Sequence, residues 1–251
     1  MEQSAEDMFC LPSAFSGSRP VVLKRVPPPE GENRAKKYYK EPISCNFVSY
    51  GSNVVASVRE DMLGVVTPFL ESRPAWACFE TPALNLLQDS LRPLGESVCF
   101  MAEYFLPSSG AVEPLPCPYP TAVLSREDFR GLYLPEWSNA LCADRKSLDV
   151  LGVAAKEGER IVGLAACSAD CDSMWQIGID VLPAYRRQGV AASLTSLLAR
   201  LIQENGKVPF YCCAWSNVPS ARTAFSAGFV PGWAEMTVKP TPEVHRLLGA
   251  D

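Results

Sequence analysis

The sequence predicts an α/β protein in which a sheet with flanking helices forms the C-terminal half and a smaller α/β domain precedes it. Two observations support this fold class. Short alternating apolar segments, typical of strands, recur between segments with helical periodicity. A proline-rich stretch at residues 107–120 separates the two halves. We therefore expect an extended lead-in (1–40), an N-terminal α/β domain (41–113) and a C-terminal domain (118–240).

In the N-terminal half, the pattern predicts two strands and two helices. Leu84, Leu87 and Leu91 lie on one side of the second helix, and Pro82 suits its first turn. Pro68 is expected to end the first helix. The expected elements are a strand at 43–50, a helix at 58–67, a helix at 82–91 and a strand at 97–106.

The C-terminal half alternates strands with helices. Ser125 and Asp128 predict a helix start, and Asn217 is a candidate N-cap. The helix after residue 190 carries an apolar stripe and is closed by Asn205 and Gly206. The expected elements are a hairpin at 150–155 and 161–167, a strand at 174–181, a helix from 190, a strand at 208–216, a helix from 217 to 228, and final strands at 229–230 and 233–238.

The composition argues against several classes of protein. The 251 residues are 47% hydrophobic and 20% charged, as in a globular protein. A net charge of -5 provides no basic field for a polynucleotide, so we expect no nucleic-acid partner. No apolar stretch is long enough to cross a bilayer, and the acidic first residues do not resemble a secretory signal. We expect a cytoplasmic protein without a membrane partner.

Ten cysteines and one histidine limit the available site chemistry. Because no C-x-x-C pair occurs and several cysteines lie in apolar runs, we expect reduced, packed thiols and no metal site, with metal ligation as the weaker alternative. His245 lies in the C-terminal tail, far from any partner that a nucleophile would need. A reactive-thiol enzyme using Cys212 and Cys213 is an alternative, but nothing near them predicts a lowered thiol pKa.

The turn between the strand at 174–181 and the following helix is suited to an anion. It contains Arg186, Arg187 and Gly189. The first N–H groups of a helix lack partners inside the helix and lie at the positive end of its dipole. Glycine lets the backbone approach a phosphate closely, and arginine adds charge-assisted hydrogen bonds.

Arg186, Gly189 and Ala191 match a phosphate-binding motif: Arg or Gln, two residues, Gly, one residue, then Gly or Ala. This motif is that of the GNAT superfamily of N-acetyltransferases. Asn217 and the helix after it follow at family-like distances, so residues 118–239 resemble a GNAT domain, best over 174–230. The resemblance implies a mixed, splayed central sheet flanked by helices, with acetyl-CoA as the co-substrate.

The resemblance also implies roles for individual residues. The pantetheine arm or acetyl carbonyl would pair with the backbone of Val181 and Ile179, with Asn217 and Ser220 facing it from the other side of the splay. The pyrophosphate would be held by the turn and the first helical turn: Arg186, Arg187, Gln188, Gly189, Val190, Ala191 and Ala192. A purely structural interpretation is the alternative, in which Gly189 is a tight turn, Asn217 a cap and the arginines a solvated surface.

Catalytic groups are less evident. Many family members place a tyrosine, which protonates the departing thiolate, where this chain has Ala224, and the neighbouring Phe225 has no titratable proton. The family's common carboxylate positions correspond here to residues such as Trp175 and Cys212. Asp180 is the candidate base, and its side chain is expected on the strand face opposite to Ile179 and Val181. Its alternative role is to anchor a loop. Asp170, Asp172 and Glu136 are further candidates, although Asp170 and Asp172 also suit a turn.

Three interpretations of function follow. The first is an enzyme that transfers acetyl from acetyl-CoA to an amine of a small molecule or a chain terminus, with the N-terminal domain shaping the acceptor site. The second is a CoA-binding sensor or interaction module, suggested by Ala224. The third is a dimerisation domain, suggested only by the apolar helix at 82–91, and a homodimer is an open expectation.

Overall fold

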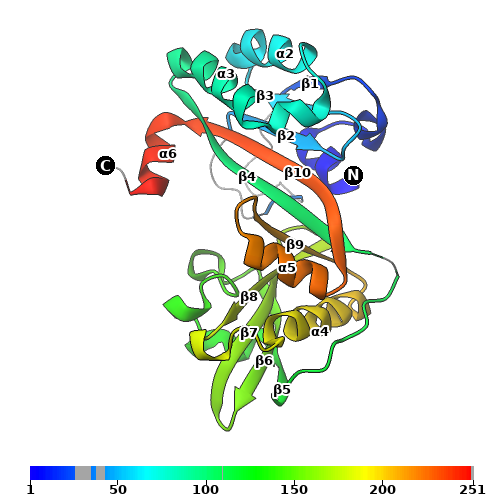
Figure 1. Ribbon diagram of the computed structural model, residues 1–251, viewed down its shortest axis with the longest axis vertical. Helices are drawn as coiled ribbons and strands as arrows, with labels where there is room; N and C mark the ends of the chain where they lie inside the picture. The colour runs from blue at the N-terminus through cyan, green and yellow to red at the C-terminus, as the bar shows by residue number, and fades with distance from the viewer. Residues whose placement is uncertain (26–34, 38–42, 109, 250–251) are drawn as a thin grey trace. The chain divides into compact units, whose positions relative to one another are not determined.

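The computed structural model describes residues 1–25, 35–37, 43–108 and 110–249 (Figure 1). It is a mixed α/β structure, as the sequence predicts, and its residues cluster into two compact units. Unit 1 is formed by the described residues within Met1–Ala35, Tyr39–Glu103 and Gly232–Asp251. Unit 2 is formed by those within Lys36–Tyr38 and Tyr104–Pro231.

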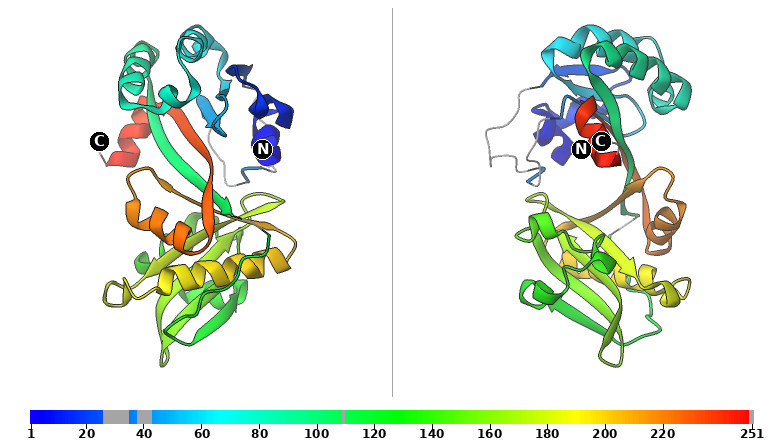
Figure 2. Two further views of the ribbon diagram at one scale, coloured as in Figure 1. Left: turned by 45° about the vertical axis from the view of Figure 1, so that its right-hand side comes forward. Right: turned by 90° about the vertical axis from the view of Figure 1, so that its left-hand side faces the viewer.

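Unit 1 contains a sheet covered by two helices. Its strand order is β1-β3-β2-β10-β4, in which β1 runs parallel to β3, and β2 runs antiparallel to β3 and β10. Helices α2 and α3 lie together beside these strands (Figures 1 and 2), and apolar residues of both helices share a core with β2, β3 and β10. The bounds are β1 Val21–Lys24, β2 Cys45–Ser49, β3 Val55–Val58, β4 Glu96–Pro107, β10 Phe229–Pro240, α1 Glu2–Met8, α2 Leu63–Glu71, α3 Thr81–Leu91 and α6 Thr241–Leu248.

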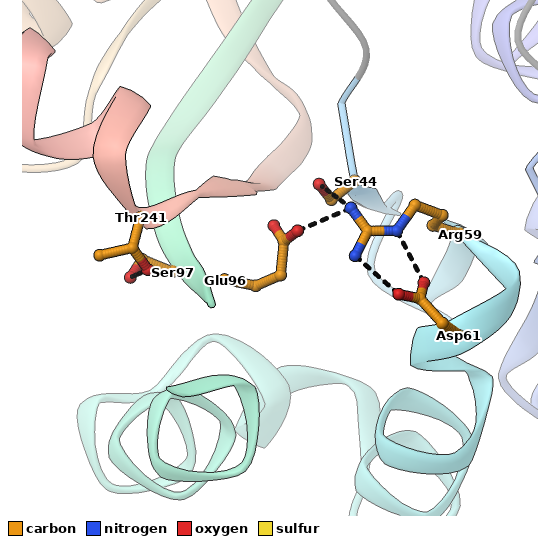
Figure 3. A network of polar contacts seen from close by, with 6 residues as sticks. All are labelled: Ser44, Arg59, Asp61, Glu96, Ser97 and Thr241. Atoms are coloured by element: carbon orange, nitrogen blue, oxygen red, sulfur yellow. Dashed lines mark hydrogen bonds and ion pairs between the residues drawn. The ribbon is translucent and has the colours of Figure 1, made fainter. Parts of the chain in front are cut away.

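A polar network lies next to this core (Figure 3). Arg59 donates hydrogen bonds to the buried Glu96 at 2.6 Å and to Ser44 at 3.0 Å, and its other nitrogens bind Asp61. These hydrogen bonds raise the pKa of Arg59. The positive charge of Arg59 therefore offsets the cost of burying the Glu96 carboxylate, which is 3% exposed.

Two parts of unit 1 differ from the sequence expectation. The range 1–40 was expected to be an extended lead-in, and its residues 26–34 and 38–40 lie outside the described residues. In the described part, helix α1 and strand β1 form and residues such as Ala5 and Phe15 are buried. The helix expected at 58–67 is instead α2, which begins at Leu63 and passes Pro68. The residue four positions before that proline is Gly64, an exposed glycine, so the unpaired carbonyl can be solvated.

Unit 2 contains the mixed sheet expected from the resemblance. Its strand order is β9-β8-β7-β6-β5, antiparallel throughout except that β8 and β9 run parallel. Helices α4 and α5 contribute to one apolar core with these strands (Figure 1). The bounds are β5 Thr121–Ser125, β6 Asp149–Glu157, β7 Arg160–Ser168, β8 Met174–Val181, β9 Val208–Ala214, α4 Val190–Glu204 and α5 Val218–Ser226.

Most expected elements of the C-terminal half are confirmed, including the hairpin β6–β7, strand β8 and helices α4 and α5. The capping box of Ser125 and Asp128 is present, but it begins a 3₁₀ helix. The two final strands are one strand, β10. The 3₁₀ helices are η1 Pro12–Ser16, η2 Glu60–Met62, η3 Ala75–Phe79, η4 Arg92–Leu94, η5 Arg126–Gly131, η6 Pro135–Trp137, η7 Ala143–Arg145 and η8 Pro183–Tyr185. Among the described residues, no helix combines the length and apolar character that a membrane span requires.

Candidate active site

The central feature of unit 2 is an opening between β8 and β9. Their parallel pairing runs from Met174↔Val208 to Ile177↔Tyr211. Strand β8 nevertheless continues to Val181 and β9 continues to Ala214. Within the described residues, the two strands are therefore unpaired with each other beyond Ile177 and Tyr211, which is the splay that the resemblance implied.

The backbone of β8 is oriented toward this opening at alternate residues. Leu182 donates its N–H to the Val162 carbonyl at 2.9 Å, so the even-numbered residues of β8 bond to β7. The odd-numbered residues face β9, as the bond from the Val208 N–H to the Ser173 carbonyl shows. Ile179 and Val181 consequently present their backbone groups to the opening. Their roles in ligand binding stay a prediction.

The turn after β8 has the geometry of an anion site. Arg187 and Gly189 both have left-handed backbone, with φ of 63° and 84°, and both are exposed. The structure records no hydrogen bond from the N–H groups of residues 187–192 to any described residue. N–H groups that have no partner among the described residues, at a helix start that follows an exposed turn, can bind phosphate oxygens. The predicted pyrophosphate residues therefore lie together, and their binding of a pyrophosphate stays a prediction.

Side chains hold this turn from both ends. Gln188 accepts a hydrogen bond from the Tyr119 hydroxyl at 2.8 Å and donates one to the Ala184 carbonyl at 3.2 Å. Tyr185 donates to Glu157 at 2.5 Å, and this hydrogen bond raises the pKa of Tyr185. The Arg186 Nε donates to the Val181 carbonyl at 2.9 Å. The side chains of Gln188 and Arg186 thus hold the turn in place. Because these contacts do not use the backbone N–H groups of the turn, those groups can bind a ligand.

The proline-rich segment expected to be a linker lies along α4, as Figure 2 shows. Ser193 donates to the Pro116 carbonyl at 2.7 Å, and Ser196 accepts from the Leu115 N–H at 2.9 Å. Gln203 accepts from the Val112 N–H at 2.8 Å. The sequence analysis did not single out these polar residues of α4, although two serines at helical spacing among apolar residues were the available signal.

Asn217 and Ser220 occupy the start of α5. The Asn217 side chain accepts a hydrogen bond from the Ser220 N–H at 3.2 Å, which confirms the predicted N-cap. The Ser220 hydroxyl lies 2.7 Å from the Tyr211 hydroxyl, at the last paired position of β9. Ala224 is fully buried in the core, and Phe225 packs edge-on against Phe105.

The candidate carboxylates are placed differently from one another. Asp170 is fully buried and binds Arg145 and Ser168, and burial raises its pKa. Asp172 forms an ion pair with Lys37, and Glu136 is exposed in η6. Asp180 accepts hydrogen bonds from the loop that follows η6. These contacts explain why a carboxylate is present at position 180 without any catalytic role. A catalytic role for Asp180 therefore stays a prediction.

The comparisons with known proteins identify a family for part of the chain. Residues 115–232 match the family model described as GNAT acetyltransferase. This part of the chain is therefore a GNAT acetyltransferase domain. No curated protein is significantly similar to the chain in sequence.

Several solved structures resemble the chain at low identity. A protein from Novosphingobium aromaticivorans assigned to the GNAT family of acetyltransferases is 18% identical, with a TM-score of 0.45 over 57% of this chain and 66% of that chain. A GCN5-related N-acetyltransferase-like protein from Streptococcus suis is 16% identical, with a TM-score of 0.48 over 62% and 68%. A GCN5-related N-acetyltransferase from Kribbella flavida is 19% identical, with a TM-score of 0.46 over 60% and 62%. The match thus spans less than two thirds of the Novosphingobium and Kribbella chains.

Proposed function

We propose that unit 2 is an N-acetyltransferase that moves the acetyl group of acetyl-CoA to an amine of a small molecule or a chain terminus. The observation that carries this proposal is the opening between β8 and β9, which ends at the unpaired N–H groups before and within the first turn of α4. Backbone groups along an open strand edge suit an extended, amide-containing arm. N–H groups at a helix start suit a pyrophosphate.

Each part of the site has a role in this proposal. The N–H groups of residues 187–192 bind the pyrophosphate, and the exposed Arg187 adds positive charge. The backbone of Ile179 and Val181 pairs with the pantetheine arm. Asn217 uses its side-chain oxygen to cap α5, so its amide nitrogen is available to the arm from the other side. These residues fit acetyl-CoA as a co-substrate.

The reaction is direct attack of a neutral amine on the thioester carbonyl carbon. A C–N bond forms, the C–S bond breaks, and the amine proton leaves to Asp180 or to water. A backbone N–H of Ile179 or Val181 would stabilise the oxyanion, because both face the opening. The acidic net charge of -5 also modestly favours encounter with a cationic acceptor, which loses a proton before it attacks.

A CoA-binding sensor is the second candidate function. Ala224 favours it, since this buried methyl group cannot protonate the leaving thiolate. The two functions share the cofactor site and differ in turnover. Release of free CoA thiol with any member of an amine panel would favour the transferase, whereas binding without release would favour the sensor.

Calorimetric titration with acetyl-CoA and CoA tests the shared site. Gly189→Trp should abolish binding, because it places a large side chain at the anion turn. Gly206→Trp is the matched control, since Gly206 also has left-handed backbone and open space around its Cα, but it follows the opposite end of α4. Binding that only Gly189→Trp removes would support the site. A folded wild-type protein that binds neither ligand would overturn both functions.

Cytoplasmic location and a homodimer belong to the same proposal. Light scattering of the full chain at micromolar concentration tests the dimer, and a monomeric mass would overturn it. Fractionation of cells that express the full chain tests the compartment.

A further inference from the structure

The proposed reaction leaves one proton unassigned. When the C–S bond breaks, the sulfur carries the electron pair, and a donor close to it lowers the barrier. Ala224 and Phe225 offer no such proton. The proton must instead come from another residue or from solvent. In the proposed function the acetyl group lies where β8 and β9 separate, so a donating residue would lie there.

Tyr211 is located at that point. It is the last residue of β9 that pairs with β8, and its side chain is 3% exposed. Its ring packs edge-on against Phe105 at 6.4 Å on the side of the sheet that carries α4 and α5. The hydroxyl lies 2.7 Å from the hydroxyl of Ser220, in the first turn of α5. The tyrosine thus directs a polar group from the separation point toward a predicted cofactor-binding residue.

We propose that the Tyr211 hydroxyl donates the proton to the departing thiolate of CoA and that Ser220 is the positioning residue that orients it. This inference rests on the proposed function. At 2.7 Å either hydroxyl can be the donor. In the arrangement that we propose, Ser220 donates to the phenol oxygen, which leaves the tyrosine hydrogen for the thiolate. The other tyrosines of this site, Tyr119 and Tyr185, hold the anion turn and lie at its far end from the separation point.

The proton balance closes without a further reactant. The amine nitrogen bonds to the acetyl carbon, the C–S bond breaks, and the sulfur accepts the Tyr211 proton. Ser220 passes its hydrogen to the phenolate and recovers one from solvent, which has received the proton lost by the amine. The products are the amide and the CoA thiol, and both hydroxyls return to their starting state.

The electrostatics of the site keep Tyr211 in its protonated form. Burial raises the pKa of Tyr211 to about 12, and the hydrogen bond with Ser220 lowers it. The hydroxyl therefore carries its proton at every physiological pH. The Ser220 contact also stabilises the phenolate that remains after transfer.

The test compares Tyr211→Phe, Ser220→Ala and Ser220→Thr with the wild type, using acetyl-CoA and an amine that turns over. We expect kcat to fall about 10²-fold in Tyr211→Phe, in the usual range for loss of an acid catalyst. Ser220→Ala should lose less, and Ser220→Thr, which keeps the hydroxyl, should restore activity. Calorimetric affinity for CoA and the melting temperature should remain near wild type in Tyr211→Phe. Tyr133→Phe is the matched control, since it removes a phenol elsewhere in unit 2.

The outcomes separate this inference from the proposed function. If Tyr211→Phe keeps wild-type kcat, the inference is wrong and the transferase function stands. If the wild type binds CoA but releases no thiol with any amine, both the transferase function and the role of Tyr211 are overturned. If Tyr211→Phe loses CoA affinity in proportion to kcat, Tyr211 acts in binding and the inference also fails.

Discussion

The carboxylate of Asp180 binds Asn139 twice, accepting its backbone N–H at 2.8 Å and its side-chain amide at 2.6 Å. It also accepts the N–H of Ala140 at 3.0 Å. The side chain lies on the face of β8 opposite to Ile179 and Val181, as strand alternation requires. One carboxylate therefore joins the strand that borders the opening to the loop after η6.

Asp180→Asn tests whether this carboxylate anchors the loop or accepts the substrate proton. An amide has only one oxygen to accept the three N–H groups, so we expect the free energy of unfolding to fall by about 1–3 kcal/mol. In the activity that Asp180→Asn retains, the decrease in rate at low pH should be the same as in the wild type. Loss of that decrease with unchanged stability would instead identify Asp180 as the base.

Gly178 permits a close contact between the same strand and loop. A Cβ built on Gly178 would lie 1.9 Å from the carbonyl oxygen of Asn139, which is backbone and cannot move aside alone. We expect Gly178→Ala to destabilise unit 2 by more than about 2 kcal/mol, because the loop must leave the strand. Urea denaturation measures this.

Gly131→Ala is its control, since nothing lies within 4 Å of a Cβ at Gly131. The control should change the free energy of unfolding by about 0.5 kcal/mol or less. Equal effects of the two substitutions would contradict the proposed contact.

The sequence predicts local features of this site well. Strand β8, the glycine turn, helix α4 and the Asn217 cap were all expected from neighbouring residues, because periodicity and capping are local properties. The splay itself was expected only through the family resemblance, since no residue pattern reports where two strands stop pairing.

Features that depend on distant contacts were not predicted. The pairing of β10 with β2, from Ala234↔Ser49 to Val238↔Cys45, brings residues 232–249 into unit 1, whereas the sequence boundary placed residues up to 240 in the C-terminal domain. The Tyr211–Ser220 contact likewise joins a strand and a helix through a turn. In both cases the contact depends on tertiary packing, and the local propensity of the residues does not predict which segments come together.

Arg59→Met should destabilise unit 1. The substitution removes the partner of Glu96, which is 3% exposed, and leaves its charge uncompensated. We expect a loss of about 3–5 kcal/mol, seen as faster amide hydrogen exchange in β2 and β4. Asp61→Asn is the control, because Asp61 is exposed and its ion pair with Arg59 should be worth about 1 kcal/mol or less. An Arg59→Met protein as stable as the wild type would contradict the stabilising role of the Arg59–Glu96 pair.

Alkaline unfolding should depend on Tyr211. Its pKa rises from 10.0 to about 12 on folding, mainly through burial, so between these values the unfolded chain has lost a proton that the folded chain keeps. Deprotonation then favours the unfolded state, and the stabilising effect is complete below about pH 10 and is lost as pH rises toward 12. Over this window, the free energy of unfolding should decline by about 1–3 kcal/mol more in the wild type than in Tyr211→Phe. Urea denaturation at stepped pH measures the difference. Parallel declines would mean that the Tyr211 hydroxyl is already solvated in the folded protein and that burial does not hold its proton.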